Sequence, residues 1–261
     1  MATDVFSTPV PARANVPSTR PEIAEPRRLD GSILTRRYEI AWLTEDGGVA
    51  TDSRVAPAIA EFEEAFSALA RGTVVATTEG PVAVEDLVPG MEVLTAEGRA
   101  EPITWIGSMT LFPSGGHLKM ETATLTRITA DAFGIGRPMP DLLLGPHARI
   151  LLRDPRCRAF TGASVCYAPA RSFIEGISVI ELRPVSPVTV HNLVLRRHGS
   201  LKSAGLEIES YHPGSALADL MDPQLAEIFL SLFPHMRSLA DFGPLARPRM
   251  AARDVELALG R

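Results

Sequence analysis

The sequence predicts an all-β protein with a short helix near its start and a helical segment at its end. Between residues 73 and 210, short apolar runs alternate with turn signals such as Glu79-Gly80 and Pro89-Gly90. Many short strands separated by such turns are typical of a sandwich, a barrel or a horseshoe of strands. After Pro213-Gly214 the apolar residues recur three and four positions apart, which is the spacing of a helix.

The composition limits the classes of function. The chain has 261 residues, a net charge of −5 and 45% hydrophobic residues, enough for one large domain or two small ones. No basic stripe is visible, so we expect no nucleic acid partner. No segment holds the ~18–20 consecutive apolar residues that cross a bilayer, and the start of the chain lacks the apolar core of a secretory signal. We therefore expect a cytoplasmic protein without a membrane span; secretion without an N-terminal signal and an unknown protein partner both stay open.

The first 67 residues divide into an arm and an extension. Residues 1–31 are rich in Pro, Ser, Thr and Ala, and we expect a disordered arm because such a segment buries little apolar surface. In the extension, 32–67, the run 38–43 alternates as a strand does, and Asp46-Gly47-Gly48 predicts a hairpin. Phe62, Phe66 and Leu69 have helical spacing, which predicts a short amphipathic helix over 61–70.

Ten strands and a helical tail are predicted after this helix. The expected strands are 73–77, 81–86, 91–95, 102–111, 123–129, 142–153, 165–171, 178–183, 188–196 and 206–210. The tail, 215–261, contains Asp222-Pro223, and Asp222 is expected to cap a helix whose first residue is Pro223. From Gly243 onward the chain is rich in Pro and Arg and is expected to fray, apart from a helical turn over 254–259.

The two cysteines, Cys157 and Cys166, are nine positions apart and form no CxxC pair. A disulfide across a hairpin is one interpretation. Two buried free thiols are the interpretation that we favour, because free Cys is among the most buried residue types. Zinc binding lacks the spaced ligands that such sites use.

Four blocks of sequence resemble a known family. The stretch 71–93, RGTVVATTEGPVAVEDLVPGMEV, resembles the opening of the Hint (hedgehog/intein) domain, the self-cleaving module of inteins and hedgehog proteins. Residues 125–152, 167–173 and 189–214 resemble later blocks of its bacterial branch, in the same order. The resemblance covers about 68–214 and implies a Hint-like horseshoe of short strands.

The resemblance also implies which residues the family's chemistry would use. In the family, a Cys or Ser attacks the carbonyl before it, while a mid-domain Thr and His polarise that carbonyl and protonate the departing amine. In inteins a terminal Asn completes splicing. These four positions fall on Ala68, Gly145, Ala148 and Ser210, none of which carries the family's reactive group.

Two neighbouring residues could supply a relocated catalytic pair. Ser67 precedes Ala68, and His147 precedes Ala148. On a strand, a shift of one residue turns a side chain to the opposite face, so two bulges would be needed to bring the pair together. The simpler interpretation is a hydroxyl on the helix surface and a solvent-facing imidazole.

The closing block offers three further polar candidates. Asn192 aligns with an Asp that assists catalysis in some Hint domains, and His198 or His191 could occupy the ancestral pocket. Local hydrogen bonding explains all three equally simply. A metal site formed by the three histidines 147, 191 and 198 would need all of them to point inward, and we expect neither a metal nor another cofactor.

The favoured interpretation is a Hint-domain protein that has lost splicing and autocleavage and acts as a binding or structural module, not as an enzyme. The alternative is active autoprocessing, in which Ser67 and His147 carry out an acyl shift and cleave or ligate the peptide. A third interpretation is an adaptor that docks a partner on its helical segment 215–240.

Overall fold

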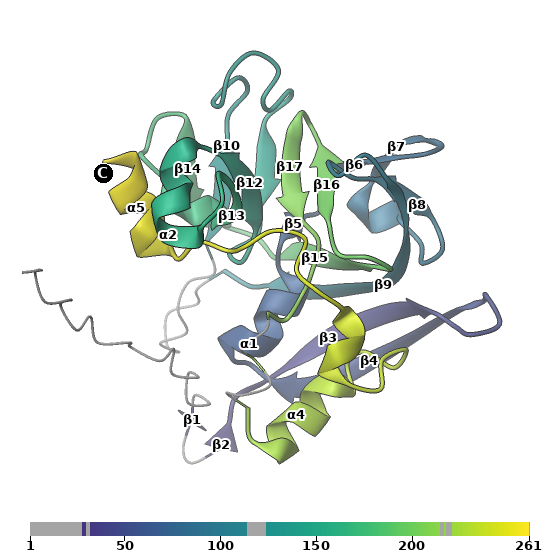
Figure 1. The fold of residues 1–261 in the computed structure, drawn as a ribbon. Coiled ribbons are helices and arrows are strands. Elements are labelled where there is room, and N and C mark those ends of the chain that lie inside the picture. Colours follow the sequence, from purple (N-terminus) through teal and green to yellow (C-terminus); the bar gives the residue numbers. More distant parts are fainter. Residues whose placement is uncertain (1–27, 30–31, 114–123, 215–216, 218–220, 261) are drawn as a thin grey trace, which may run out of the picture.

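A computed structural model describes residues 28–29, 32–113, 124–214, 217 and 221–260 of this chain. Antiparallel strands are the main regular structure of these residues, and short helices lie around them (Figure 1). Of the predicted disordered arm, 1–31, all but Arg28–Leu29 lies outside the described residues. No helix in the described ranges is long and apolar enough to cross a membrane.

The strands are short, apart from β3, β4, β9 and β15. In chain order they are β1 (Arg28–Leu29), β2 (Ser32–Ile33), β3 (Thr35–Leu43), β4 (Val49–Pro57), β5 (Leu69–Ala70), β6 (Val74–Thr77), β7 (Gly80–Ala83), β8 (Glu92–Leu94), β9 (Ala100–Leu111), β10 (Leu125–Ile128), β11 (Leu142–Leu144), β12 (Arg149–Arg153), β13 (Val165–Pro169), β14 (Val179–Leu182), β15 (Val188–Leu195), β16 (Ser200–Ser203) and β17 (Leu206–Glu209).

The helices are all short. The α-helices are α1 (Ala60–Glu63), α2 (Arg158–Thr161), α4 (Pro223–Leu230) and α5 (Ala252–Leu259). The 3₁₀ turns are η1 (Glu64–Phe66), η2 (Val84–Asp86), η3 (Pro155–Cys157), η4 (Ala170–Phe173) and η5 (Leu239–Phe242). The predicted cap of α4 is confirmed, because the Asp222 side chain accepts a hydrogen bond from the Leu225 N–H.

Strand β9 joins the N-terminal extension to the rest of the protein. The main sheet runs in the order β14-β10-β11-β5-β15-β9-β8-β6-β7, and β3 also pairs with β9. β9 can hold both neighbours on one edge because residues 100–102 pair with β8 and residues 105–108 pair with β3. The β3–β4 hairpin, which Asp46-Gly47-Gly48 predicts, is therefore a continuation of this sheet.

A second sheet of four strands, β13-β12-β17-β16, packs against the first. Residues 248–250 run beside its edge strand β13: the Tyr167 N–H donates to the Pro248 carbonyl at 2.9 Å, and the Met250 N–H donates to the Tyr167 carbonyl at 2.8 Å. The expectation that this Pro- and Arg-rich stretch frays is wrong, because the sheet edge fixes its backbone. Cys157 and Cys166 are buried free thiols, as predicted.

The protein has two hydrophobic cores. One lies between the two sheets and takes in Val255 and Ala258 of α5. The other fills the space between β9, β3, the N-terminal helix and α4, and it is built around Trp105. The Trp105 ring lies against Phe66 and Phe233, and its Nε1–H donates to the Leu232 carbonyl at 2.8 Å.

Gly107 permits this aromatic packing. A Cβ at residue 107 would lie 2.6 Å from Cδ1 of Phe66 and would also overlap the ring of Trp105. Real Cβ atoms do not come so close to other carbons, so a side chain at this position would push the rings apart. The second core therefore binds both the N-terminal extension and the C-terminal helical segment to β9.

Two predicted elements end earlier than the sequence pattern indicates. The helix expected over 61–70 ends at Phe66, and Leu69–Ala70 forms β5 between β11 and β15. The strand expected over 142–153 is broken by the segment 145–148 into β11 and β12. In both places the backbone changes direction within a largely apolar stretch of sequence. The periodicity of apolar residues alone does not detect such a change of direction.

Candidate functional site

The hydroxyl of Ser67 lies at the end of the N-terminal helix and is fully buried. Its Oγ is 2.6 Å from the carbonyl oxygen of Glu63 and 2.7 Å from Nδ1 of His147. The expectation that a one-residue shift keeps this pair apart is wrong. Ser67 follows η1 and His147 lies in the break between β11 and β12, so the alternation of faces along a strand applies to neither residue.

The hydroxyl of Ser67 has only one proton, and this fixes which atom donates in its hydrogen bond with His147. A serine hydroxyl has one proton, and the Glu63 carbonyl can only accept. If Ser67 donates to Glu63, then Nδ1 of His147 carries a proton and donates to Ser67 Oγ. Burial lowers the pKa of His147, with Glu64 and Glu63 opposing it, so the neutral ring with one N–H is favoured. In this tautomer the imidazole holds the hydroxyl in place and does not accept its proton.

The backbone of Gly145 lies directly over the peptide bond between Ser67 and Ala68. The Gly145 N–H donates to the Ala68 carbonyl at 2.8 Å, and the His147 N–H donates to the Ser67 carbonyl at 3.2 Å. A Cβ at residue 145 would lie 2.7 Å from the carbonyl carbon of Ser67 and even closer to its oxygen. Residue 145 therefore has no room for any side chain.

Ala68 and Ala148, which the sequence resemblance places at the family's nucleophile and histidine positions, lie in the core. Ala68 is 2% exposed and Ala148 is 1% exposed, and both belong to the core between the two sheets. The Ala68 N–H donates to the His191 carbonyl at 3.0 Å, so the amide that a Hint reaction would cleave is a fixed part of the sheet.

Asn192 and His198 form no hydrogen bond with Ser67 or His147, and each binds other groups of the described chain. Asn192 donates from Nδ2 to the Glu64 carbonyl at 3.1 Å, which fixes the last turn of the N-terminal helix. His198 lies 3.0 Å through Nε2 from the carbonyl of Ser210, and Nδ1 accepts the Ala246 N–H at 2.9 Å. His198 thus fastens the C-terminal segment to the end of β17. In the described part of the chain, no three His, Cys, Asp or Glu side chains are grouped so that they could hold a metal ion.

Four largely buried charged residues near the Ser67–His147 pair form a chain of ion pairs that the sequence pattern does not reveal. Arg149 forms an ion pair with Glu64 and lies 3.8 Å from Glu209, and Arg249 binds Glu209 at 2.9 Å. Burial raises the pKa of Glu64 and Glu209, but the arginines outweigh it and hold both below the usual range. Arg249 lies in the stretch expected to fray, so its role could not be foreseen.

Ser210, which the sequence resemblance places at the position of the intein's terminal Asn, is also built into the fold. It is fully buried, its N–H donates to the Gly199 carbonyl at 2.9 Å, and its Oγ accepts the Gly199 N–H at 3.2 Å. The chain continues into Tyr211, which is buried in the second core. Neither end of the Hint-like region is a free terminus.

Similarity to a known protein family identifies the family of this chain. A family model for the Hint domain matches residues 67–215, more than half of the chain. This chain belongs to the Hint domain family. The predicted all-β Hint-like fold, with a short N-terminal helix and a helical C-terminal appendage, is confirmed. The family match begins at Ser67, the residue that supplies the hydroxyl of the hydroxyl–imidazole pair.

Several solved structures of Hint type are similar to this chain. A bacterial intein-like domain from Clostridium thermocellum is 13% identical with a TM-score of 0.38, over 56% of this chain and 99% of that domain. A splice-inactive variant of the AceL NrdHF class 3 split intein is 13% identical with a TM-score of 0.37, over 55% and 97%. The MchDnaB-1 intein is 13% identical with a TM-score of 0.32, over 55% and 99%. The search of curated proteins gives no match.

Proposed function

We propose that this Hint-domain protein does not splice or cleave itself and that it serves as a structural or binding module. The observation that carries the proposal is the contact between Gly145 and the Ser67 carbonyl. In the Hint family a Thr and a His assist attack on the carbonyl before the nucleophile. Here the Ser67 carbonyl occupies the space that a Thr side chain at residue 145 would need. The residues at the nucleophile and His positions, Ala68 and Ala148, carry only buried methyl groups.

The segments before Ser67 and after Ser210 are both fixed by contacts with the Hint region, which supports the same proposal. Upstream of Ser67, β3 pairs with β9 through four residues. Downstream of Ser210, Leu232 binds Trp105, and Arg249 binds both Glu209 and the His212 carbonyl, the latter at 2.6 Å. The Hint region is therefore a framework that holds the N-terminal hairpin and the C-terminal helices in fixed positions.

The 2.7 Å contact between Ser67 Oγ and His147 favours one alternative, autoprocessing at Phe66-Ser67. Oγ would attack the Phe66 carbonyl carbon, the bond from that carbon to the Ser67 nitrogen would break, and the hydroxyl proton would pass through His147 to the freed amine. Water would then hydrolyse the ester and release a fragment that ends at Phe66. This route requires the other tautomer of His147 and the loss of the Glu63 hydrogen bond.

Intact-mass spectrometry under denaturing conditions distinguishes the two functions, because fragments of this fold would stay together in native buffer. The purified chain, Ser67→Ala and Ser172→Ala are incubated with and without hydroxylamine. Ser172 is a suitable control because it is buried and its Oγ has no partner among the described residues. We expect the full mass in every sample. A fragment ending at Phe66 in wild type and Ser172→Ala, but absent in Ser67→Ala, would overturn the proposal in favour of autoprocessing.

A further inference from the structure

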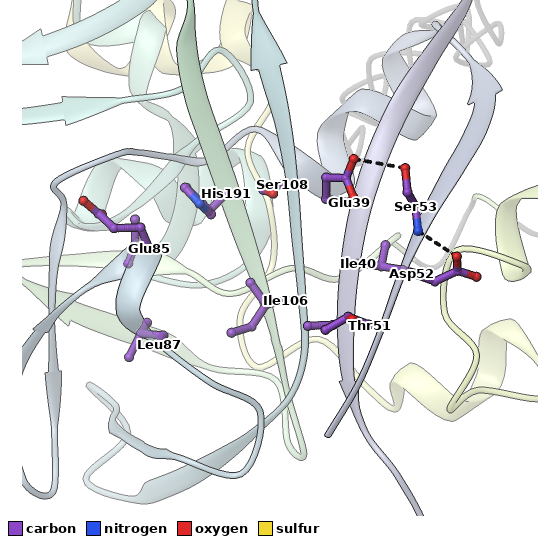
Figure 2. Close-up of a pocket in the computed structure, with 12 residues that line it drawn as sticks. Glu39, Ile40, Thr51, Asp52, Ser53, Glu85, Leu87, Ile106, Ser108 and His191 are labelled. Carbon is purple, nitrogen blue, oxygen red and sulfur yellow. Dashed lines mark hydrogen bonds between the residues drawn. The ribbon is translucent and has the colours of Figure 1, made fainter. Parts of the chain in front are cut away.

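A row of four polar residues crosses four neighbouring strands on one face of the main sheet. The pairing register places His191 of β15 opposite Ser108 of β9, Ser108 opposite Glu39 of β3, and Glu39 opposite Ser53 of β4. Residues that are paired directly across strands point to the same face. In Figure 2 the row runs from His191 through Ser108 and Glu39 to Ser53.

The next row on the same face is largely apolar. Two residues further along each strand, Leu193, Ile106, Ala41 and Thr51 are paired in the same order. The turn η2 and the residue after it, Leu87, form a wall beside these rows and bring Glu85 next to His191. The two rows and the wall enclose a hollow of about 500 Å³, which is within the size range of small-ligand pockets.

The ring of His191 lines this hollow. The residue is 7% exposed, and its Nδ1 is buried without a hydrogen-bond partner among the described residues. Burial lowers the pKa of His191 to about 4, although Glu85 and the backbone carbonyl of Leu69 act in the opposite direction, so the ring is neutral near pH 7. A buried polar atom that lacks a partner is costly, and in native structures such an atom calls for a specific explanation such as a ligand.

The charge of the hollow indicates the sign of that ligand. Glu39 accepts a hydrogen bond from Ser53 Oγ at 3.0 Å, and no described cationic side chain forms an ion pair with it. Glu85 accepts from the Gly72 N–H at 2.8 Å and lies 3.5 Å from Arg71, which is itself exposed. Asp52 belongs to the other face of the hairpin, where it binds Arg54 at 2.8 Å. Two of the groups that face the hollow are carboxylates, and no lysine or arginine is among the residues that line it.

We propose that this hollow binds the ammonium or guanidinium end of an aliphatic chain, as carried by a lysine or arginine side chain. The cation would pair with Glu39 beside the His191 ring, and its methylene groups would lie over Ile106, Ala41 and Leu87. Carboxylates disfavour an anion. A metal ion would need a third protein ligand, and in the residues that the structure describes no such group of three exists. The inference goes beyond the proposed function and does not depend on whether Ser67 reacts.

The test uses the full chain with ¹⁵N-labelled histidine. Blocked lysine, blocked arginine and 1,4-diaminobutane are titrated, and blocked norleucine serves as the uncharged control with a similar chain. We expect a saturable shift of the His191 Nδ1 resonance with the cations and none with norleucine. Tighter binding of the blocked amino acids than of the diamine would identify a protein partner as the source, and the reverse order would identify a free amine. An equal response to norleucine, or no saturable shift with any cation, would overturn the proposal.

Two variants distinguish a direct contact between Glu39 and the cation from a general attraction by the negative charge of the β3–β4 hairpin. Glu39→Gln should weaken binding of the preferred cation by about tenfold or more, as expected for the loss of a charge-assisted hydrogen bond. Asp52→Asn removes the same charge from the neighbouring strand but on the opposite face, so it should change the affinity by less than about twofold. Equal weakening in both variants would show that the hollow attracts cations only through the net charge of the hairpin, and would overturn the proposed site.

Discussion

Gly145 is packed against the carbonyl group of Ser67 so closely that a Cβ at residue 145 would lie 2.7 Å from that carbonyl carbon. Both partners are fixed by hydrogen bonds: the Gly145 N–H binds the Ala68 carbonyl, and the His147 N–H binds the Ser67 carbonyl. The two segments, 78 positions apart in sequence, are therefore locked together by their backbones. This relationship determines what can and cannot be restored at the ancestral site.

Gly145→Thr, which would reinstate the family's residue, should destabilise the protein by about 1–3 kcal/mol or more, because two backbones must separate to admit the side chain. Gly48→Ala is a matched control, since residue 48 lies in the exposed β3–β4 turn and a Cβ there meets only polar side-chain atoms, the nearest at 3.1 Å. Urea denaturation of the two variants measures the difference. Equal stabilities would show that the segments at 67 and 145 are not locked.

Ala68→Cys should not make the chain cleave itself. The thiol would stand at the family's nucleophile position, but neither residue 145 nor residue 148 offers a group to polarise the Ser67 carbonyl or to protonate the leaving amine. Dithiothreitol, which cleaves thioesters, should leave the full mass unchanged. Ala170→Cys controls for a new thiol at an equally buried alanine. Release of a fragment ending at Ser67 from Ala68→Cys alone would show that a thiol suffices.

Arg249→Gln should destabilise the protein by about 3–5 kcal/mol, because Glu209, whose side chain is 3% exposed, would lose its nearest cation. The double variant Arg249→Gln/Glu209→Gln should recover much of the loss, since no buried charge is then left uncompensated. Thermal or urea denaturation of both variants gives the comparison. Arg253→Gln, in which an exposed pair with Asp254 is lost, should change stability by less than about 1 kcal/mol.

Stability should fall as the pH drops from 6.5 toward 4. Burial lowers the pKa of His191, His212 and His235 to about 4 in the folded protein. Below pH 6.5 the unfolded chain therefore binds protons that the folded chain does not, and each histidine costs about 1.4 kcal/mol per unit of pH over that interval. Their contribution is fully present above pH 6.5.

Urea midpoints between pH 7 and pH 5 measure this effect. The paired carboxylates with lowered pKa, such as Glu64 and Glu209, lose their contribution only as the pH falls below the ordinary value near 4.3, so this interval isolates the histidines. His212→Gln should make the profile shallower. An unchanged slope in this variant would show that His212 titrates normally in the folded state.

Local signals in the sequence predicted the local structure well. The Asp46-Gly47-Gly48 turn and the Asp222 cap depend on a few adjacent residues, and both are found where they are expected. The Hint fold itself was recognisable because its four blocks keep their turns and apolar positions. β16 was not predicted, because three of its four residues, SLKS, are polar and they become a strand only through pairing with β17.

The site was harder to predict because its geometry depends on contacts distant in sequence. The expectation for Ser67 assumed a helix that continues to Ala70, whereas the helix ends at Phe66 and lets the hydroxyl turn toward His147, 80 positions away. The polar row at the hollow joins four strands whose register no local pattern specifies. Arg249 shows the same limit: its segment has the composition of a loose tail, and contacts with the edge of β13 and with Glu209 give it a fixed place.

Trp105 gives this protein an internal optical reporter. Its indole is fully buried between Phe66 and Phe233 and is hydrogen-bonded to Leu232, while the other tryptophan, Trp42, is partly exposed. Detachment of the C-terminal helices would admit water to the Trp105 ring and shift its emission to longer wavelength, even if the Hint sheets stayed intact. Fluorescence of a Trp42→Phe variant would therefore report the separation of the appendage from the Hint framework.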